Sequence, residues 1–191
     1  MKLITITGPS GAGKGFLKDR IRQLWPFIYE PPWYTTRTPR SDEEHRGDRI
    51  CISPNEFANM QTKDLFLLTD TVGNHQYGLL RQTLDQHPVC LTELRLHLLH
   101  ATQHSNLFSI ALVPESIDFL HSRLTKRGTE SMQKIEERIS IARQELPLII
   151  ENKTLFNFFL VVSAHNEHLV IGETLKTLKT IEPFINGRKT Q

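Results

Sequence analysis

A short glycine-rich segment near the N-terminus constrains this chain more than any other feature. Gly8–Lys14 reads Gly-Pro-Ser-Gly-Ala-Gly-Lys and directly follows the mostly apolar run Leu3–Thr7. Glycines at this spacing allow a tight turn whose backbone N–H groups face an anion, and Lys14 adds a mobile positive charge. A helix that begins near Gly13 would direct its positive dipole end toward the same anion. The pattern of strand, loop and helix predicts a phosphate-binding loop rather than an ordinary glycine-rich turn.

The position after the lysine departs from the usual pattern of such loops. It usually holds Ser or Thr, whose hydroxyl binds Mg²⁺, whereas this chain has Gly15 followed by Phe16. Neither of these side chains can bind a metal ion. We therefore expect Mg²⁺ to be held mainly by water, by phosphates and by carboxylates elsewhere in the chain.

Composition limits the classes of protein to which the chain can belong. A length of 191 residues fits one domain with a sizeable core, and a net charge of +2 gives no reason to expect a nucleic-acid partner. Cys51 and Cys90 are too few for a disulfide framework, which favours a reducing compartment. Met1-Lys2 leads directly into a strand, so no targeting peptide is expected, and no apolar run reaches the ~20 residues of a membrane span. We expect a cytoplasmic protein with no membrane partner, as a monomer or homodimer.

Apolar runs alternate with amphipathic segments along the chain, which predicts a parallel α/β sheet. Strands are expected at residues 2–7, 50–52, 65–71, 89–91, 107–113 and 156–162. Helices are expected at residues 13–24, 79–86, 97–104, 116–127, 131–146 and 167–181. Ser53, Pro54 and Glu56 have the spacing of a helix start. The segment from about residue 32 to 86 is interpreted as an insertion between the first and second core strands.

Two polar segments inside this insertion are candidates for binding a second phosphate. Thr35–Arg40 places Arg37 and Arg40 three residues apart beside threonine hydroxyls. The planar fork of arginine donates two parallel bonds to phosphate oxygens, although a solvated surface loop would have the same composition. Tyr77 precedes the flexible Gly78, where it could bind a ligand or serve in packing.

Taken together, these segments resemble the guanylate kinase family over most of the chain. The matching segments are Gly8–Lys14, Thr35–Arg40, Gly47-Asp48, Tyr77-Gly78, Pro114–Ile117, Arg123–Glu130, Arg138 and Ala142–Leu146. The resemblance implies one domain over residues 1–191 with the three-layer P-loop kinase fold. It also implies a five-stranded parallel core sheet (residues 1–31, 87–125 and 147–186), an acceptor-binding insertion (about 32–86) and a helical lid (about 126–146).

The resemblance also implies roles for individual residues in ATP-dependent phosphoryl transfer with Mg²⁺. The donor phosphates would be held by the loop residues Gly8, Ser10, Gly11, Ala12, Gly13, Lys14 and Gly15. Lys14, Arg127 and Arg138 would be catalytic, the two arginines reaching the transferring group, and Glu93 would meet the metal through water. Arg37, Arg40 and Tyr77 would hold the phosphate of a small-molecule acceptor. Such chemistry needs alignment and charge neutralisation more than covalent help from the protein. Adenylate kinases also have glycine at the position of Gly15.

The positions that would recognise guanine depart from the family pattern. Leu68 and Leu79 stand where polar groups are usual, and Arg95 stands where an aspartate is usual. Asp70 lies two residues beyond Leu68, hence on the same face of an extended strand, and is the acidic residue that could recognise the base. A site without hydrogen-bond acceptors discriminates poorly for guanine, so weak base selectivity is expected.

Three functions remain open from the sequence. The main interpretation is ATP-dependent phosphorylation of a nucleoside monophosphate, GMP to GDP. Ribose 1,5-bisphosphate phosphokinases, which make 5-phosphoribosyl diphosphate, are similar to guanylate kinases and use an acceptor with no base. A non-catalytic protein-binding module of the same fold is the third, and the intact donor loop argues against it.

Overall fold

The computed structural model describes residues 2–39, 47–102, 106–128, 130–163 and 179–186. The chain divides into two compact units. The insert unit comprises Phe27–Thr92, and the core unit comprises Lys2–Pro26 together with Glu93–Gln191. The chain passes from the insert unit to the core unit at the last residue of β6 (Val89–Glu93). The insertion expected at residues 32–86 lies within the insert unit.

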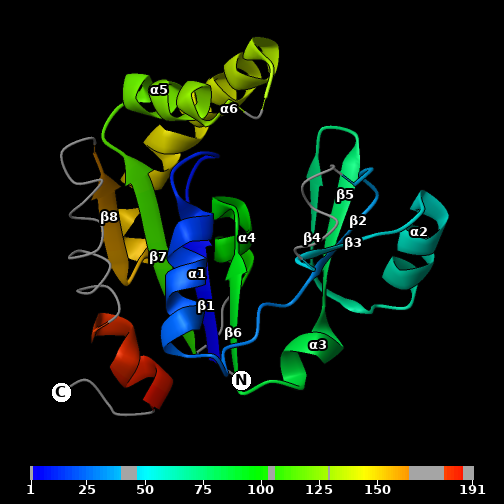
Figure 1. Ribbon diagram of the computed structural model, residues 1–191. Coiled ribbons are helices and arrows are strands. Elements are labelled where there is room, and N and C mark those ends of the chain that lie inside the picture. Colours follow the sequence, from blue (N-terminus) through cyan, green and yellow to red (C-terminus); the bar gives the residue numbers. More distant parts are fainter. Residues whose placement is uncertain (1, 40–46, 103–105, 129, 164–178, 187–191) are drawn as a thin grey trace. The chain divides into compact units, whose positions relative to one another are not determined.

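The core unit contains a sheet with the strand order β6-β1-β7-β8 (Figure 1), in which Val89–Thr92 of β6 are counted with the insert unit. The other three strands are β1 (Lys2–Thr7), β7 (Leu107–Pro114) and β8 (Phe158–Val162). β1 pairs in parallel with β7, and β7 pairs in parallel with β8. β1 and β7 are buried along almost their whole length, as expected for parallel strands that are covered on both faces.

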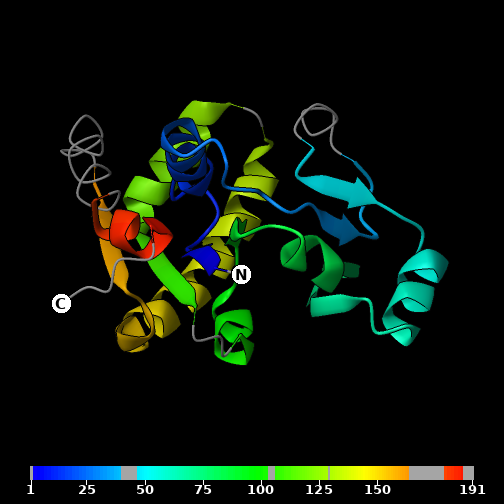
Figure 2. The same ribbon diagram turned by 90° about the horizontal axis from the view of Figure 1, so that it is seen from below.

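Helices cover both faces of this sheet (Figure 2). α1 (Lys14–Leu24) and a helix at residues 179–186 lie on one face, whereas α4 (Leu96–Ala101) and α6 (Met132–Glu151) lie on the other. The three layers confirm the predicted fold class. The remaining core elements are α5 (Ile117–Arg127) and the short 3₁₀ turn η1 (Lys153–Leu155). The closing helix expected at residues 167–181 lies mostly outside the described residues.

The described sheet has four strands rather than the predicted five. Tyr29, in the segment that precedes the insertion, makes an isolated parallel bridge to Cys90 on β6 instead of a strand. Pro26 lies three residues before it, and Pro31-Pro32 follows shortly after it. Proline has no N–H to donate to a strand partner, so the prolines on both sides prevent longer pairing.

α6 continues to Glu151, whereas the sequence predicts an end at Leu146. Pro147 lies inside the helix and cannot donate to the carbonyl four residues earlier. The helix continues because Leu146 and Ile149 are buried against β7 in one apolar cluster, and this burial offsets the lost hydrogen bond. Neither α6 nor any other helix among the described residues has the length and apolar character needed to cross a membrane.

The insert unit contains a second sheet, with the strand order β3-β2-β5-β4. The strands are β2 (Trp33–Thr35), β3 (Arg49–Cys51), β4 (Phe66–Val72) and β5 (His75–Leu80). β2 pairs in parallel with β3, and β5 pairs antiparallel with both β2 and β4. The predicted strands at 50–52 and 65–71 correspond to β3 and β4, whereas β2 and β5 were not predicted.

Two short helices complete the insert unit. α2 (Pro54–Thr62) begins at the predicted cap, where the Ser53 side chain accepts from the Glu56 N–H and the Glu56 carboxylate accepts from the Ser53 N–H. α3 (Arg81–Asp85) is shorter than the helix predicted at 79–86. Leu79 belongs instead to β5, because it is fully buried there, directly opposite Trp33 of β2.

Candidate active site

The segment between β1 and α1 forms a tight turn at the carboxyl end of β1. Gly13 has a φ of 103°, in the left-handed region that glycine adopts without strain. Gly8 lies so close to β7 that a Cβ there would be 2.1 Å from the carbonyl oxygen of Leu112. The Ala12 N–H donates to the Pro9 oxygen at 3.2 Å. Glycines at positions 8 and 13 are therefore required by the path of the backbone itself.

Lys14 is the first residue of α1, and its side chain folds back over the turn. Its ammonium group donates to the carbonyl oxygens of Gly8 at 2.9 Å and Pro9 at 3.1 Å. The same Nζ lies 3.5 Å from Oε2 of Glu93, at the end of β6. Lys18, one turn further along α1, places its Nζ 3.0 Å from Oε1 of the same carboxylate. Glu93 therefore pairs with two ammonium groups beside the loop.

The groups that could contribute to a metal site near the loop are few. Gly15 offers no ligand, and the space beside it is open to at least 4 Å. In the part of the chain that the structure describes, no three His, Cys, Asp or Glu residues form a group that could hold a metal ion. Glu93 is a carboxylate near the loop, in contact with the two lysines. One carboxylate fits Mg²⁺ that is bound mainly by water and by phosphates.

α5 and α6 form a helical hairpin next to the loop (Figure 1). Gly128 ends α5 with a φ of 67°, and the Ser131 hydroxyl caps the first turn of α6. On α6, the Arg138 guanidinium donates to the Ser10 hydroxyl of the loop and to the Glu130 carboxylate. The side chains of Arg138 and Glu130 are 22% and 17% exposed. The predicted catalytic arginine thus contacts the predicted donor loop directly.

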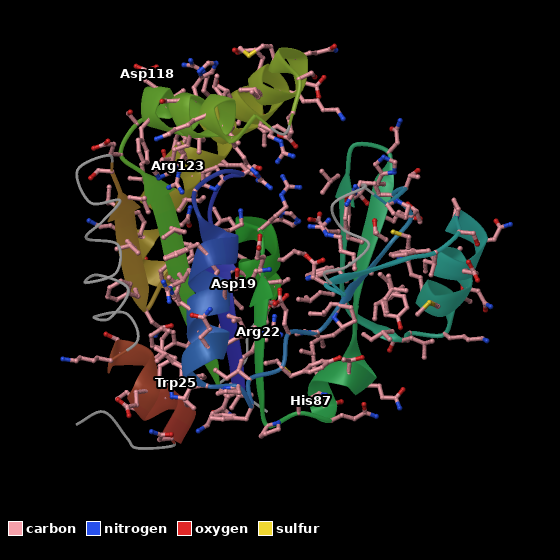
Figure 3. All side chains as sticks on the ribbon, viewed as in Figure 1. Asp19, Arg22, Trp25, His87, Asp118 and Arg123 are labelled. Atoms are coloured by element: carbon pink, nitrogen blue, oxygen red, sulfur yellow. The ribbon has the colours of Figure 1, made fainter. Side chains whose placement is uncertain are left out.

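Two other arginines on α5 have different surroundings. Arg127, which the family resemblance assigns to the transferring group, is the last residue of α5 and is exposed. Arg123, one turn earlier, lies beside the loop, with Nη2 3.6 Å from where a Cβ on Gly13 would be (Figure 3). Leu120 and Leu124 are buried next to Gly11 and hold this part of α5 against the loop. The sequence assigned no role to Arg123, although its spacing of four residues from Arg127 placed both on one helix face.

In the insert unit, two of the predicted acceptor residues, Asp70 and Tyr77, lie on one face of the sheet. Asp70, Tyr77 and Thr35 are direct neighbours across β4, β5 and β2 and therefore share a face. The register of β4 shifts between Phe66 and Leu68, so that Asp70 is opposite Tyr77. We call this surface the Tyr77 face.

Arg37 follows β2 and forms hydrogen bonds with residues close to it in the sequence. Its N–H donates to the Thr35 hydroxyl at 3.1 Å, and its Nη1 donates to the Thr38 oxygen at 3.2 Å. The Thr36 hydroxyl accepts from the Gln76 N–H at 2.9 Å, which joins this segment to β5. The backbone therefore places Arg37 close to the strand that carries Tyr77. Arg40, the second predicted arginine, lies outside the described residues.

The positions that depart from the family pattern have well-defined surroundings. Leu68 and Leu79 are buried and belong to the core of the insert unit. Arg95 donates from Nε and Nη2 to Oε1 of Glu145, at 3.3 and 3.1 Å. Asp70, in contrast, remains partly exposed on the Tyr77 face. Leu68 and Leu79 pair with each other two residues along from the Asp70–Tyr77 pair, so all four side chains share one face and differ in burial alone.

Arg49 is a functional candidate that was not selected from the sequence. Its guanidinium lies 5.9 Å from the centre of the Tyr77 ring, and its Nε is 3.9 Å from Oδ2 of Asp48. No sequence pattern marked Arg49, because all three residues of β3 are exposed; the parallel register of β3 against β2 puts Arg49 opposite Trp33 and on the same face.

The two cysteines differ in exposure, and Cys51, which pairs with Thr35, lies on the Tyr77 face. Cys51 is exposed on β3, whereas Cys90 is buried on β6. Burial raises the pKa of the Cys90 thiol to about 11, so it stays protonated at neutral pH and does not act as a nucleophile.

Comparisons with known proteins agree with this geometry. The family model described as guanylate kinase matches residues 1–181. A guanylate kinase from Polaromonas sp. is 33% identical over 150 residues, which cover 75% of this chain and 73% of the relative. One from Prochlorococcus marinus subsp. pastoris is 32% identical over 189 residues, covering 94% and 97%.

A solved structure supports the fold independently. The crystal structure of guanylate kinase from Anaplasma phagocytophilum superposes with a TM-score of 0.66 at 17% identity, covering 100% of this chain and 87% of that chain. Because the family model spans nearly the whole sequence, the resemblance predicted from the loop, the lid arginines and the Tyr77-Gly78 pair is confirmed. The chain belongs to the guanylate kinase family, a family of ATP-dependent phosphotransferases.

Proposed function

We propose that the chain transfers the γ-phosphoryl group of ATP to GMP, forming GDP. The observation that supports this function most strongly is the contact of Arg138 on α6 with Ser10 in the loop. A lid arginine and a phosphate-binding loop that meet at one point are suited to surround the transferring group with positive charge. The family membership and the named activity of its relatives favour GMP as the acceptor.

In this proposal, the core unit binds the donor. The backbone of Gly8–Gly15 surrounds the β-phosphate, and Lys14 leaves its present carbonyl partners to bind the β- and γ-phosphates. Arg138 and Arg127 neutralise the charge that develops on the transferring group. Arg138 would exchange Glu130 for the phosphoryl oxygens, since both are anionic partners of the same guanidinium.

The insert unit binds the acceptor. Arg37, Arg40 and Tyr77 hold its phosphate, and Asp70 on the Tyr77 face accepts hydrogen bonds from the guanine N1–H and amino group. Asp70 is partly exposed and lies directly opposite Tyr77 in the sheet, which supports this role. The side chains of Leu68 and Leu79 are aliphatic, so they add no hydrogen-bond acceptor for the base.

Magnesium would be held mainly by phosphates and water, with Glu93 contributing through water. A bound Mg²⁺ would neutralise phosphate charge and help to orient the γ-phosphoryl group. The oligomeric state and the cytoplasmic location stay predictions.

The proposed function is tested by measuring ADP release from ATP with a panel of acceptors. The panel contains GMP, dGMP, AMP, UMP, CMP and ribose 1,5-bisphosphate, each at several concentrations. The proposal expects GMP to give the highest kcat/KM. Faster turnover of ribose 1,5-bisphosphate would assign the chain to sugar-phosphate chemistry, and no turnover with any acceptor would favour a binding module.

A further inference from the structure

Lys18 lies next to the donor loop, although neither the family pattern nor the proposed mechanism gives it a role. It follows Lys14 by four residues, so both side chains lie on one face of α1. Its Nζ is 3.0 Å from Oε1 of Glu93, nearer than the 3.5 Å that separates Lys14 Nζ from Oε2. The Lys18 side chain is only 12% exposed. A largely buried lysine normally requires a charged partner, and Glu93 supplies it.

The ion pairs that Lys14 and Lys18 form with Glu93 affect each other, because both ammonium groups share one carboxylate. In the described state, Glu93 is paired with both lysines. When a polyphosphate binds at the loop, Lys14 must leave the carboxylate and turn to the phosphate oxygens. A Glu93 carboxylate without Lys18 would then retain Lys14 as a competing partner and would repel the incoming phosphates.

We propose that Lys18 is a positioning residue that keeps Glu93 neutralised and thereby makes Lys14 available for the donor phosphates. This inference rests on the proposed role of Lys14 in binding the donor. It carries particular weight in this chain, because Gly15 provides no hydroxyl ligand for Mg²⁺, so the lysines must supply more of the positive charge at the loop.

Calorimetric titration of the full chain with ATP tests the inference, with and without Mg²⁺ (the latter in EDTA). The variants are Lys18→Met, Glu93→Gln and the double variant, with Lys18→Arg as the conservative replacement. Arg20→Met is the matched control, because it removes one positive charge from the same helix at a residue that contacts Phe16 and Gln23 instead. Thermal unfolding of each variant verifies that it is folded.

Lys18→Met is expected to weaken ATP binding about fivefold to tenfold in EDTA, which corresponds to the loss of one partly buried charge interaction. In EDTA, where no metal ion uses the Glu93 carboxylate, Glu93→Gln is expected to bind ATP at least as tightly as the wild type. The double variant should return to within about twofold of the wild type, because the neutral amide that replaces the Glu93 carboxylate no longer needs a counter-ion. Lys18→Arg and Arg20→Met should bind like the wild type.

Two results would overturn the inference. One is unchanged ATP affinity in folded Lys18→Met. The other is weak binding in Lys18→Met that Glu93→Gln does not restore, because Lys18 would then contact the phosphates directly. The proposed function is judged separately with Lys14→Ala, since equal ATP affinity of that variant and the wild type would place the donor site elsewhere.

Discussion

In the core unit the backbone places the groups that we propose bind phosphate, whereas in the insert unit the side chains of a small sheet provide them. The turn of Gly8–Lys14 is determined by a left-handed glycine and by close packing on β7. The Tyr77 face instead depends on the register between β4 and β5 and on which side chains occupy it. A site formed by backbone groups tolerates few substitutions, because they disturb the path of the chain. The ligand specificity of a site formed by side chains can change with a single substitution. The loop of the core unit accordingly keeps the family motif through Lys14 and departs from it at Gly15, whereas Leu68 and Leu79 of the insert unit depart at positions assigned to acceptor recognition.

Replacing Lys14 with alanine tests the core unit most severely. Lys14→Ala should lower kcat by about 10³-fold or more, because no other side chain replaces its contact with the β- and γ-phosphates. Steady-state kinetics measure the effect, with Lys126→Ala, an exposed lysine on α5, as the control. Thermal unfolding should be unchanged in both. Near wild-type activity of Lys14→Ala would show that the donor site is not at the Gly8–Lys14 loop, and the contrast between the two units would then fail.

Arg138→Ala should lower kcat by on the order of 10³-fold with little change in the KM for ATP, because this arginine is proposed to stabilise the transferring group. Arg143→Ala, an exposed arginine on the same helix, should leave kcat within about twofold of the wild type. An unchanged kcat in Arg138→Ala would show that its contact with Ser10 serves structure alone.

Arg37→Ala should act mainly on the acceptor. We expect its KM for GMP to rise about tenfold to a hundredfold, the cost of one charge-assisted contact, with a smaller change in kcat. Arg40→Ala should act in the same direction. Arg81→Ala in the same unit, where Arg81 lies 4.0 Å from Asp64, is the control. A fall in kcat with unchanged KM would contradict the assignment of Arg37 to acceptor binding.

Asp70→Asn should give the smallest effect. It should reduce the kcat/KM for GMP by about tenfold while leaving AMP nearly unchanged, because Asn offers a donor where guanine also donates. Asp64→Asn, at a 90% exposed side chain in the same unit, controls for the loss of charge. Equal losses for GMP and AMP would mean that Asp70 supports the sheet rather than the base.

The sequence predicted the core unit better than the insert unit, for physical reasons. The loop and β1 follow from local chemistry that a few neighbouring residues determine, as does the well-predicted helix start of the insert unit, at Ser53. β2 could not be predicted, because it has only three residues and pairs with β5 more than forty positions away. β5 forms a local hairpin with β4, but its last residues were assigned to the following helix. The burial of Leu79 likewise depends on Trp33, a long-range contact that reassigned a predicted helical start to a strand.

Within the candidate site too, residues in local motifs could be predicted, whereas residues positioned by long-range packing could not. Lys14 and Arg138 belong to motifs of fixed spacing, and both lie at the loop as the motifs indicate. Lys18 and Arg123 were given no role, because their position depends on how α1 and α5 pack against the loop. Arg49 required the register of β3 against β2 before its approach to Tyr77 could be recognised.

The ratio of kcat/KM for GMP to that for AMP in the wild-type enzyme tests the central claim most directly. A complete donor site combined with a single carboxylate for the base predicts turnover of both nucleotides with ATP. The preference for GMP should then fall in the range of roughly 10- to 200-fold. A preference of about 10⁴-fold would contradict the account, because the insert unit would then hold a full guanine-recognition site despite Leu68, Leu79 and Arg95.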